Sequence, residues 1–140
     1  GGLEVAGNLS IIQRACGKLA SAGIEVSLFI AADHGQIDAA KAAGAPVVEL
    51  HTGCYADALT PTGQEAELER IRKAAYYANS LGLQVNAGHG LHFHNVEAIC
   101  RIPEIVELNI GHSIVAQALF SGLGQTVRDL KKIMCNAKSQ

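Results

Sequence analysis

The chain has few aromatic residues, which make up 4% of its 140 positions, and it has no marked excess of either charge. Eleven Lys and Arg residues against thirteen Asp and Glu residues leave a formal charge of −2, so the basic surface that nucleic acid binding needs is missing. No apolar run is long enough to cross a membrane, and no secretory signal peptide is recognisable. We therefore expect a cytoplasmic protein that binds neither nucleic acid nor a membrane.

Cysteine is also scarce. The four cysteines lie far apart, at positions 16, 54, 100 and 135, and they form no C-x-x-C pair. This spacing does not predict a zinc site, and we interpret the cysteines as free thiols of a reducing compartment. Nearly half of the residues (49%) are apolar, and the length is sufficient for one domain with a buried core.

Apolar periodicity, with glycine and proline as breakers, predicts helices that alternate with short strands. Helices are expected over residues 9–21, 33–43, 62–81, 95–100 and 122–137, with one or two further helical turns after His112. Strands are expected over residues 25–30, 46–51 and 106–110, and from residue 84 to a glycine bend. The segment 52–61 is expected to be a loop. The order predicts an α/β fold with a parallel sheet.

Details of the helices are also predicted. Residues 33–36 (DHGQ) and 62–65 (TGQE) resemble capping boxes, in which the first and fourth side chains bond to free backbone N–H groups. The last helix is expected to pack through Leu123, Val127, Leu130 and Met134.

Strand parity bears on the type of sheet. Ser27, Glu49, Asn86 and Asn109 fall on one face of their strands, and the other face is apolar. One polar residue per strand suits the lumen of a (β/α)8 barrel, whereas an open doubly wound sheet would be apolar on both faces. A complete barrel needs about 250 residues. We therefore favour a TIM barrel of which this chain supplies about half, with an open sandwich as the alternative.

Candidate functional residues follow the strands. Glu49 lies within one strand, His89 and Gly90 follow the next, and Gly111 and His112 follow the last. Carboxyl ends of parallel barrel strands share one rim, so these residues are expected to lie together there. The backbone N–H groups around the glycines and the start of the helix after His112 are suited to binding phosphate.

Five segments, taken together, resemble the PdxJ family of pyridoxine 5'-phosphate synthases, enzymes of vitamin B6 biosynthesis. They are residues 1–5, 26–30, 49–56, 85–91 and 107–114, and the strings NAGHGL and ELNIGH are the most specific. The resemblance covers the whole chain. It implies a (β/α)8 barrel of about 240 residues, of which residues 1–140 are the C-terminal portion of a single domain, with the fifth to eighth strands. Because the sequence starts with two glycines and no methionine, we also expect that the first residue is not the native start.

The resemblance implies a reaction and roles for the candidate residues. The family condenses 1-deoxy-D-xylulose 5-phosphate with 3-amino-2-oxopropyl phosphate to give pyridoxine 5'-phosphate, inorganic phosphate and water, without cofactor or metal. His89 matches the proton-donating histidine, and Glu49 matches a glutamate that stabilises the transition state. Gly90, Gly111 and His112 match contacts to the amino-ketone phosphate. A homo-octamer is implied as well. The family's other acid–base residues lie on the absent strands, so this chain alone is expected to be inactive.

Other interpretations of the same residues remain open. His89 could be a structural histidine, Glu49 a buried partner of a basic residue, and the glycines simple turn residues. His89, His92 and His94 could form a zinc site, although their spacing is not that of a helical H-x-x-x-H motif. The protein could also be a different phosphate-binding barrel enzyme, or an inactive half-barrel that serves as an interaction module.

Overall fold

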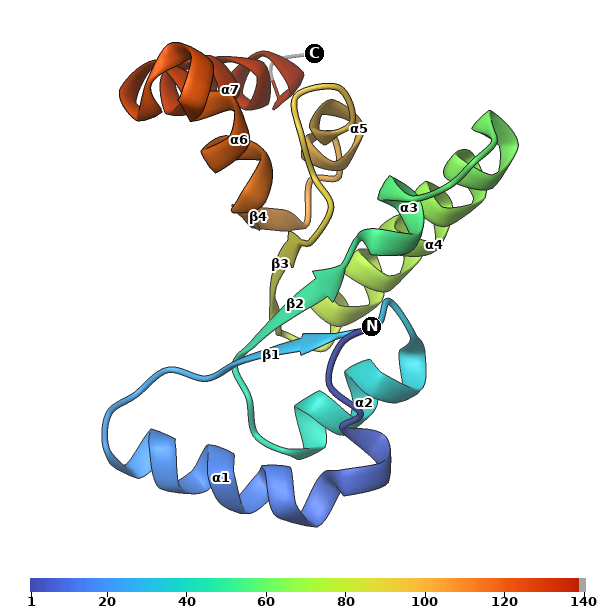
Figure 1. Cartoon of the computed structure of the whole chain (residues 1–140). Helices are drawn as coiled ribbons and strands as arrows, with labels where there is room; N and C mark the ends of the chain where they lie inside the picture. The colour runs from blue at the N-terminus through green and yellow to red at the C-terminus, as the bar shows by residue number, and fades with distance from the viewer. Residues whose placement is uncertain (139–140) are drawn as a thin grey trace.

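A single four-stranded sheet organises the computed structural model, which describes residues 1–138. Its strands are β1 (Ser27–Ile30), β2 (Val47–His51), β3 (Gln84–Gly88) and β4 (Ile105–Asn109). All neighbours are parallel, and the strands lie side by side in chain order, as Figure 1 shows. The predicted α/β class with a parallel sheet is confirmed, although β1 begins two residues later than expected and β4 lies one residue earlier.

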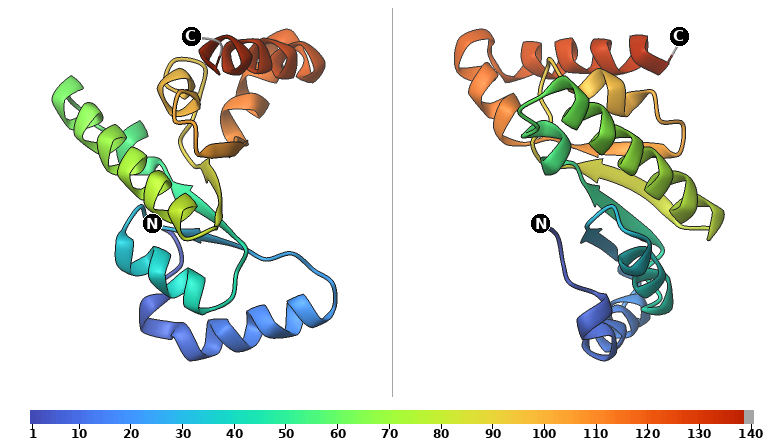
Figure 2. Two further views of the ribbon diagram at one scale, coloured as in Figure 1. Left: turned by 180° about the vertical axis from the view of Figure 1, so that it is seen from behind. Right: turned by 90° about the vertical axis from the view of Figure 1, so that its right-hand side faces the viewer.

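Helices connect the strands and pack along one side of the sheet (Figure 2). They are η1 (Ala6–Asn8), α1 (Leu9–Ser21), α2 (His34–Ala42), α3 (Gly53–Ala56), α4 (Pro61–Ser80), α5 (Val96–Cys100), α6 (His112–Ser121) and α7 (Leu123–Lys138). The core lies between the helices and the sheet, where Val48 and Leu50 of β2 meet Ile37 of α2 and Ile71 of α4, all fully buried. None of the helices in residues 1–138 is long and apolar enough to span a membrane.

The opposite face of the sheet is polar, as the strand parity predicts. Glu49 is paired with Asn86 across β2 and β3, and Asn86 with Glu107 across β3 and β4. The amide of Asn86 donates to Glu107 at 3.0 Å, and that of Asn109 donates to Glu49 at 2.8 Å. Ser27 of β1 lies on the same face. Within residues 1–138 no helix covers this face, which distinguishes the sheet from a doubly wound one.

The pairing of β3 with β4 contains a shift of register. Val85 is paired with Ile105, but the next residue of β3, Asn86, is paired with Glu107, so Val106 has no partner on β3. The extra residue changes the face to which the following side chains point. Ile105 is therefore buried under the helices, while Glu107 belongs to the polar face, and the Val106 side chain is 60% exposed.

The first predicted capping box is half correct. The Asp33 side chain accepts a hydrogen bond from the N–H of Gln36 at 3.1 Å and caps α2, as expected. The Gln36 side chain does not return to Asp33. Its Oε1 accepts from the N–H groups of Val5 and Ala6 instead, so it ties the N-terminal segment to α2. The Gln36 side chain therefore bonds to backbone groups about 30 residues earlier, and not to the N-cap residue of its own helix.

The second predicted box, at residues 62–65, is wrong. The helix starts earlier, with Pro61 in its first turn, and Thr60 is the cap, because its Oγ1 accepts from the N–H of Gly63 at 3.1 Å. Proline is favoured at the first helical position, where no N–H is needed. Thr62 therefore lies inside the first turn of α4.

Three further expectations change, two at the carboxyl ends of the strands and one in the last helix. The segment 52–61 contains the short helix α3 and is not all loop, and α6 is longer than the one or two turns expected, with ten residues. In α7, Leu130 is buried and Met134 partly buried as predicted, but Leu123 is 60% and Val127 38% exposed. Thr126 and Ala137 are buried in their place.

Candidate active site

The carboxyl ends of β2, β3 and β4 lie around a cavity of about 300 Å3. It is lined by Phe29, Glu49, His89, Gly90, Leu91, Asn109, Ile110, Gly111 and His112. All five residues singled out in the sequence, Glu49, His89, Gly90, Gly111 and His112, belong to this lining. The parallel sheet brings them together because every strand presents its carboxyl end at the same edge.

Glu49 lies within β2, and its carboxylate has room because a nearby residue of β3, Gly88, has no side chain. Gly88 lies beside it, and a Cβ on Gly88 would overlap Oε1 of Glu49 and lie 2.7 Å from the carbonyl oxygen of Asn109. Partial burial raises the pKa of Glu49, the hydrogen bond from Asn109 lowers it, and the nearby charge of Glu107 raises it again. The net effect is a raised pKa, so this carboxyl group can hold a proton nearer to neutral pH than an exposed one.

His89 follows β3 in a backbone conformation that side chains rarely adopt. Its φ is +81°, and that of Gly90 is +79°. The carbonyl groups of this bend accept hydrogen bonds from side chains elsewhere in the chain. Thr52, fully buried, is hydrogen-bonded through its hydroxyl to the carbonyl oxygens of Gly88 at 2.8 Å and His89 at 2.6 Å, and the Asn95 amide donates to that of Gly90 at 3.1 Å. Two buried side chains thus stabilise a strained bend that presents His89 to the cavity.

The remaining lining comes from the start of α6. Gly111 is the N-cap residue, without a side-chain cap, and the helix begins at His112. The Ser113 hydroxyl donates to the carbonyl oxygen of Leu91 at 2.8 Å, which joins the helix start to the loop after β3. The positive end of the helix dipole therefore lies at the cavity wall, beside the predicted phosphate-binding residues.

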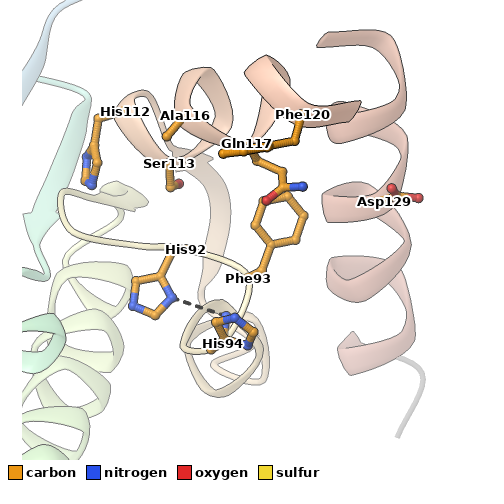
Figure 3. A pocket seen from close by; sticks show the side chains of 9 residues that line it. All are labelled: His92, Phe93, His94, His112, Ser113, Ala116, Gln117, Phe120 and Asp129. Carbon is orange, nitrogen blue, oxygen red and sulfur yellow. Dashed lines mark hydrogen bonds between the residues drawn. The ribbon is translucent and has the colours of Figure 1, made fainter. Parts of the chain in front are cut away.

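A second and larger cavity, of about 590 Å3, lies between the loop after β3 and helices α6 and α7 (Figure 3). It is lined by His92, Phe93, His94, His112, Ser113, Ala116, Gln117, Phe120 and Asp129, so it shares only His112 with the first cavity. His92 Nδ1 accepts from the N–H of His94 at 3.2 Å, while His89 lines the other cavity. In residues 1–138 no group of three or more His, Cys, Asp or Glu residues could hold a metal ion.

The sequence does not single out three residues that shape this site. Thr52 and Asn95 hold the His89 bend, and Asn109 holds the Glu49 carboxylate. Asn109 was assigned to the correct face, but nothing local indicates its partner 60 residues earlier. Thr52 carries a weak signal, as a hydroxyl directly after a strand and before a glycine.

Comparison with known proteins identifies the family. Residues 1–136 match the family described as pyridoxal phosphate biosynthesis protein PdxJ. The chain belongs to the PdxJ family. Curated relatives named pyridoxine 5'-phosphate synthase are 58% identical over 138 residues in Idiomarina loihiensis, 58% over 139 in Pseudoalteromonas translucida and 59% over 138 in Photobacterium profundum. Each alignment covers 99% of this chain but 57% of the relative, so the chain spans a little over half the length of these PdxJ proteins.

Proposed function

We propose that the chain is the C-terminal part of a pyridoxine 5'-phosphate synthase. The whole enzyme would condense 1-deoxy-D-xylulose 5-phosphate with 3-amino-2-oxopropyl phosphate to form pyridoxine 5'-phosphate, inorganic phosphate and water. The observation that carries the proposal is that Glu49, His89, Gly90, Gly111 and His112 line one cavity. The high identity to curated synthases over nearly the whole chain supports it.

The sheet is proposed to be half of a (β/α)8 barrel, so that residues 1–140 form the C-terminal portion of one domain. Strand order, strand direction and the uncovered polar face of the described sheet all support this. On this proposal β1 to β4 are the fifth to eighth barrel strands. The relatives, at about 240 residues, have room for four more strands in the remaining 43% of their length. The polar face would then line the lumen.

His89 is proposed to donate protons in the ring closure. Forming the pyridine ring requires imine formation, dehydration and loss of phosphate, and each step moves a proton at carbon or oxygen. An imidazole at the rim can serve as general acid because histidine titrates near neutral pH. Glu49 is proposed to stabilise the cationic iminium-like transition state through its carboxylate. The amide of Asn109 holds this carboxylate in position. No step passes electrons to an acceptor, so no redox cofactor is needed.

Gly90, Gly111 and His112 are proposed to hold the amino-ketone phosphate. The two glycines bring backbone N–H groups to the cavity without obstruction by a side chain, and His112 is the first residue of α6. An anion at a helix N-terminus is stabilised by the free N–H groups and by the helix dipole.

The whole enzyme is also proposed to be a homo-octamer. The support in this chain is helix α6, none of whose residues is buried. Its exposed apolar side chains include Val115 at 62%, Leu119 at 82% and Phe120 at 87% exposure. Apolar surface of this kind marks an interface between proteins.

The test is an assay of the full-length protein that contains this chain. With both phosphorylated substrates, it should release pyridoxine 5'-phosphate and phosphate in equal amounts, and omission of either substrate should abolish both products. Phosphate release without the pyridine product would indicate another phosphate-binding barrel enzyme. No reaction by a well-folded full-length protein would contradict the proposal.

A further inference from the structure

Three aromatic rings form a triangular cluster at the carboxyl edge of the sheet, and in it the ring centroids of Phe29 and His89 are 6.3 Å apart. Phe29 comes from β1, His51 from the end of β2, and His89 from the bend after β3. The ring centroids of Phe29 and His51 are 5.2 Å apart, and those of His51 and His89 are 4.6 Å apart with only 24° between the ring planes. His51 is therefore stacked on His89, and it does so without lining the cavity that His89 enters.

The His51 ring is itself held in place. The N–H of Gly53 donates to its Nδ1 at 3.2 Å, which fixes the ring plane. A Cβ on Gly53 would overlap the His51 ring, so the glycine allows the ring to lie close against the backbone. Because Gly53 opens the short helix α3, the orientation of His51 is set by the chain that directly follows it.

The charge state of His51 suits a place beside a proton donor. Burial is the main cause that lowers the pKa of His51, and the neighbouring charge of His89 lowers it further. A neutral His51 does not compete with His89 for a proton, and it avoids the repulsion between two stacked cations.

We propose that the dipeptide His51–Thr52 positions His89: the face of the His51 ring fixes the direction of the His89 imidazole, and the Thr52 hydroxyl fixes the backbone bend beneath it. Both residues act through His89, and neither is a catalytic residue. The inference rests on the proposed function, in which His89 donates a proton. What is new is that two residues adjacent in the sequence separately control the imidazole ring and the backbone of His89.

A side chain in a left-handed conformation is strained, and the conformation persists only where its surroundings over-determine it. Thr52 supplies this constraint for the backbone of His89. The imidazole of His89 is exposed at the rim and has two ring neighbours, His51 at 4.6 Å and Phe29 at 6.3 Å. Without the closer, stacked ring of His51, its rotation would be much less restricted. A displaced general acid loses rate because a shift of about 1 Å can cost on the order of 100-fold.

The inference is tested with paired variants of the full-length protein. His51→Ala removes the ring and His51→Phe keeps a flat ring without Nδ1, while Thr52→Val removes the hydroxyl and Thr52→Ser keeps it. We expect kcat to fall by roughly 10- to 100-fold in His51→Ala and Thr52→Val, with KM changed less than about threefold. His51→Phe and Thr52→Ser should stay within about threefold of the unmodified enzyme.

His34→Ala is the matched control. His34 is also a stacked histidine, on Tyr77 with ring centroids 4.2 Å apart, but it belongs to α2 and lines neither cavity. Its kcat should be unchanged. A His51→Ala enzyme with unchanged kcat would overturn the positioning role. His51→Phe as impaired as His51→Ala would overturn the part played by the ring face.

A second measurement separates this inference from the proposed function. Ring signals of His89 in histidine-labelled full-length protein can be assigned by their loss in His89→Asn and followed by NMR in the same variants. They should shift and broaden in His51→Ala but stay in place in His34→Ala. Unchanged His89 signals in His51→Ala would overturn the inference even if the enzyme makes pyridoxine 5'-phosphate. Altered signals in a protein without synthase activity would uphold the positioning and refute the proposed function.

Discussion

At the scale of single residues, the backbone at His89 determines how its role can be tested. Its φ of +81° excludes most substitutions, because only Gly, Asn, Asp and His adopt the left-handed region with any frequency. An alanine there would combine the loss of the imidazole with strain in the bend. Asparagine tolerates the conformation and has no titratable group, so His89→Asn isolates the chemistry.

We expect His89→Asn in the full-length enzyme to lower kcat by on the order of 10²–10⁴-fold, the contribution typical of general acid catalysis. KM should change little, because the loss is confined to the transition state. Steady-state kinetics with both substrates give the two values, and a thermal melt checks that the bend has survived. Unaltered turnover would leave His89 as a structural residue of the rim.

The raised pKa of Glu49 leads to a second prediction. The Asn109 amide donates to the charged carboxylate and so lowers the pKa of Glu49. Asn109→Ala removes this bond, and the pKa of Glu49 should rise further above its ordinary value of 4.5. If the charged form of Glu49 is the active one, the acid limb of kcat/KM should move to higher pH.

The control for this change is Gln84→Ala. Gln84 bonds to Asn86 on the same face of the sheet and is paired with Val47 of β2, two residues before Glu49. Its pH profile should match that of the unmodified enzyme. A carboxyl titration of Glu49 by carbon NMR gives the pKa directly, and a fall in that pKa in Asn109→Ala would contradict the assigned hydrogen bond.

Five of the residues that line the cavity could be predicted from the sequence, whereas Thr52 and Asn95, which support the bend at His89, could not. Glu49 lies within a strand, and His89 and His112 follow strands, which are visible in the sequence as apolar runs that stop near glycine. Thr52 and Asn95 act on backbone carbonyl groups of a distant bend, and Thr52 lies 37 residues before the one that it holds. Such bonds depend on how β2 and β3 are paired, and no local pattern contains that pairing.

At the scale of elements, the start of α4 shows why helix ends are hard to predict from a pattern. Both Thr60 and Thr62 precede the apolar stripe, and Thr62 has the acidic residue three positions later that a capping box requires. Pro61 decides between them, because a proline fits the first turn of a helix and leaves Thr60 as the cap.

We predict that Thr60→Ala destabilises the full-length protein by about 1 kcal/mol, the usual cost of losing an N-cap side chain. Thr62→Ala should change the free energy of unfolding by less than about half of that, since alanine is a better helix former than threonine. Chemical denaturation of the two variants gives the comparison. Equal losses would show that Thr60 is not the cap.

The sequence also predicts the other helices with unequal success. The bounds of α1 were predicted to the residue, because an apolar stripe and Gly23, with φ of +74°, define its end locally. The packing of α7 was predicted in part. Leu123 and Val127 have the right spacing for a buried stripe, but α6 and α5 contact another face of the helix, on which Thr126 and Leu130 are buried. Tertiary packing therefore overrides the periodicity.

At the scale of the whole molecule, the two outer strands of the sheet determine how strongly this chain tends to associate with other chains. On the outer side of β1, the N–H of Leu3 donates to the carbonyl oxygen of Phe29 at 2.6 Å, and no further strand pairs there among residues 1–138. The other edge of the sheet is β4. Unpaired edges and exposed apolar side chains favour association between chains.

We predict that the 140-residue chain produced alone aggregates or behaves as a molten globule, while the full-length protein melts cooperatively. Size-exclusion chromatography, dye binding and near-UV circular dichroism distinguish these states. If the half-barrel proposal holds, coexpression with the N-terminal remainder of the full-length protein should rescue it, because four further strands would pair with both edges. A monomer of this chain with a sharp melt would favour the interpretation as an independent interaction module.

The unpartnered Val106 gives the molecule a tolerance to changes in chain length. A strand that pairs residue for residue on both sides cannot lose a position without turning every later side chain to the wrong face. Between β3 and β4 one residue is surplus, and its removal would leave Ile105 next to Glu107 with the alternation of faces intact. We expect deletion of Val106 from the full-length protein to be far less damaging than deletion of Val48, which is paired on both sides, as soluble yield and melting temperature would show. Natural relatives that differ in length by one residue within the sheet should therefore differ at this strand, and the positions of Asn109 and the site above it would survive the change.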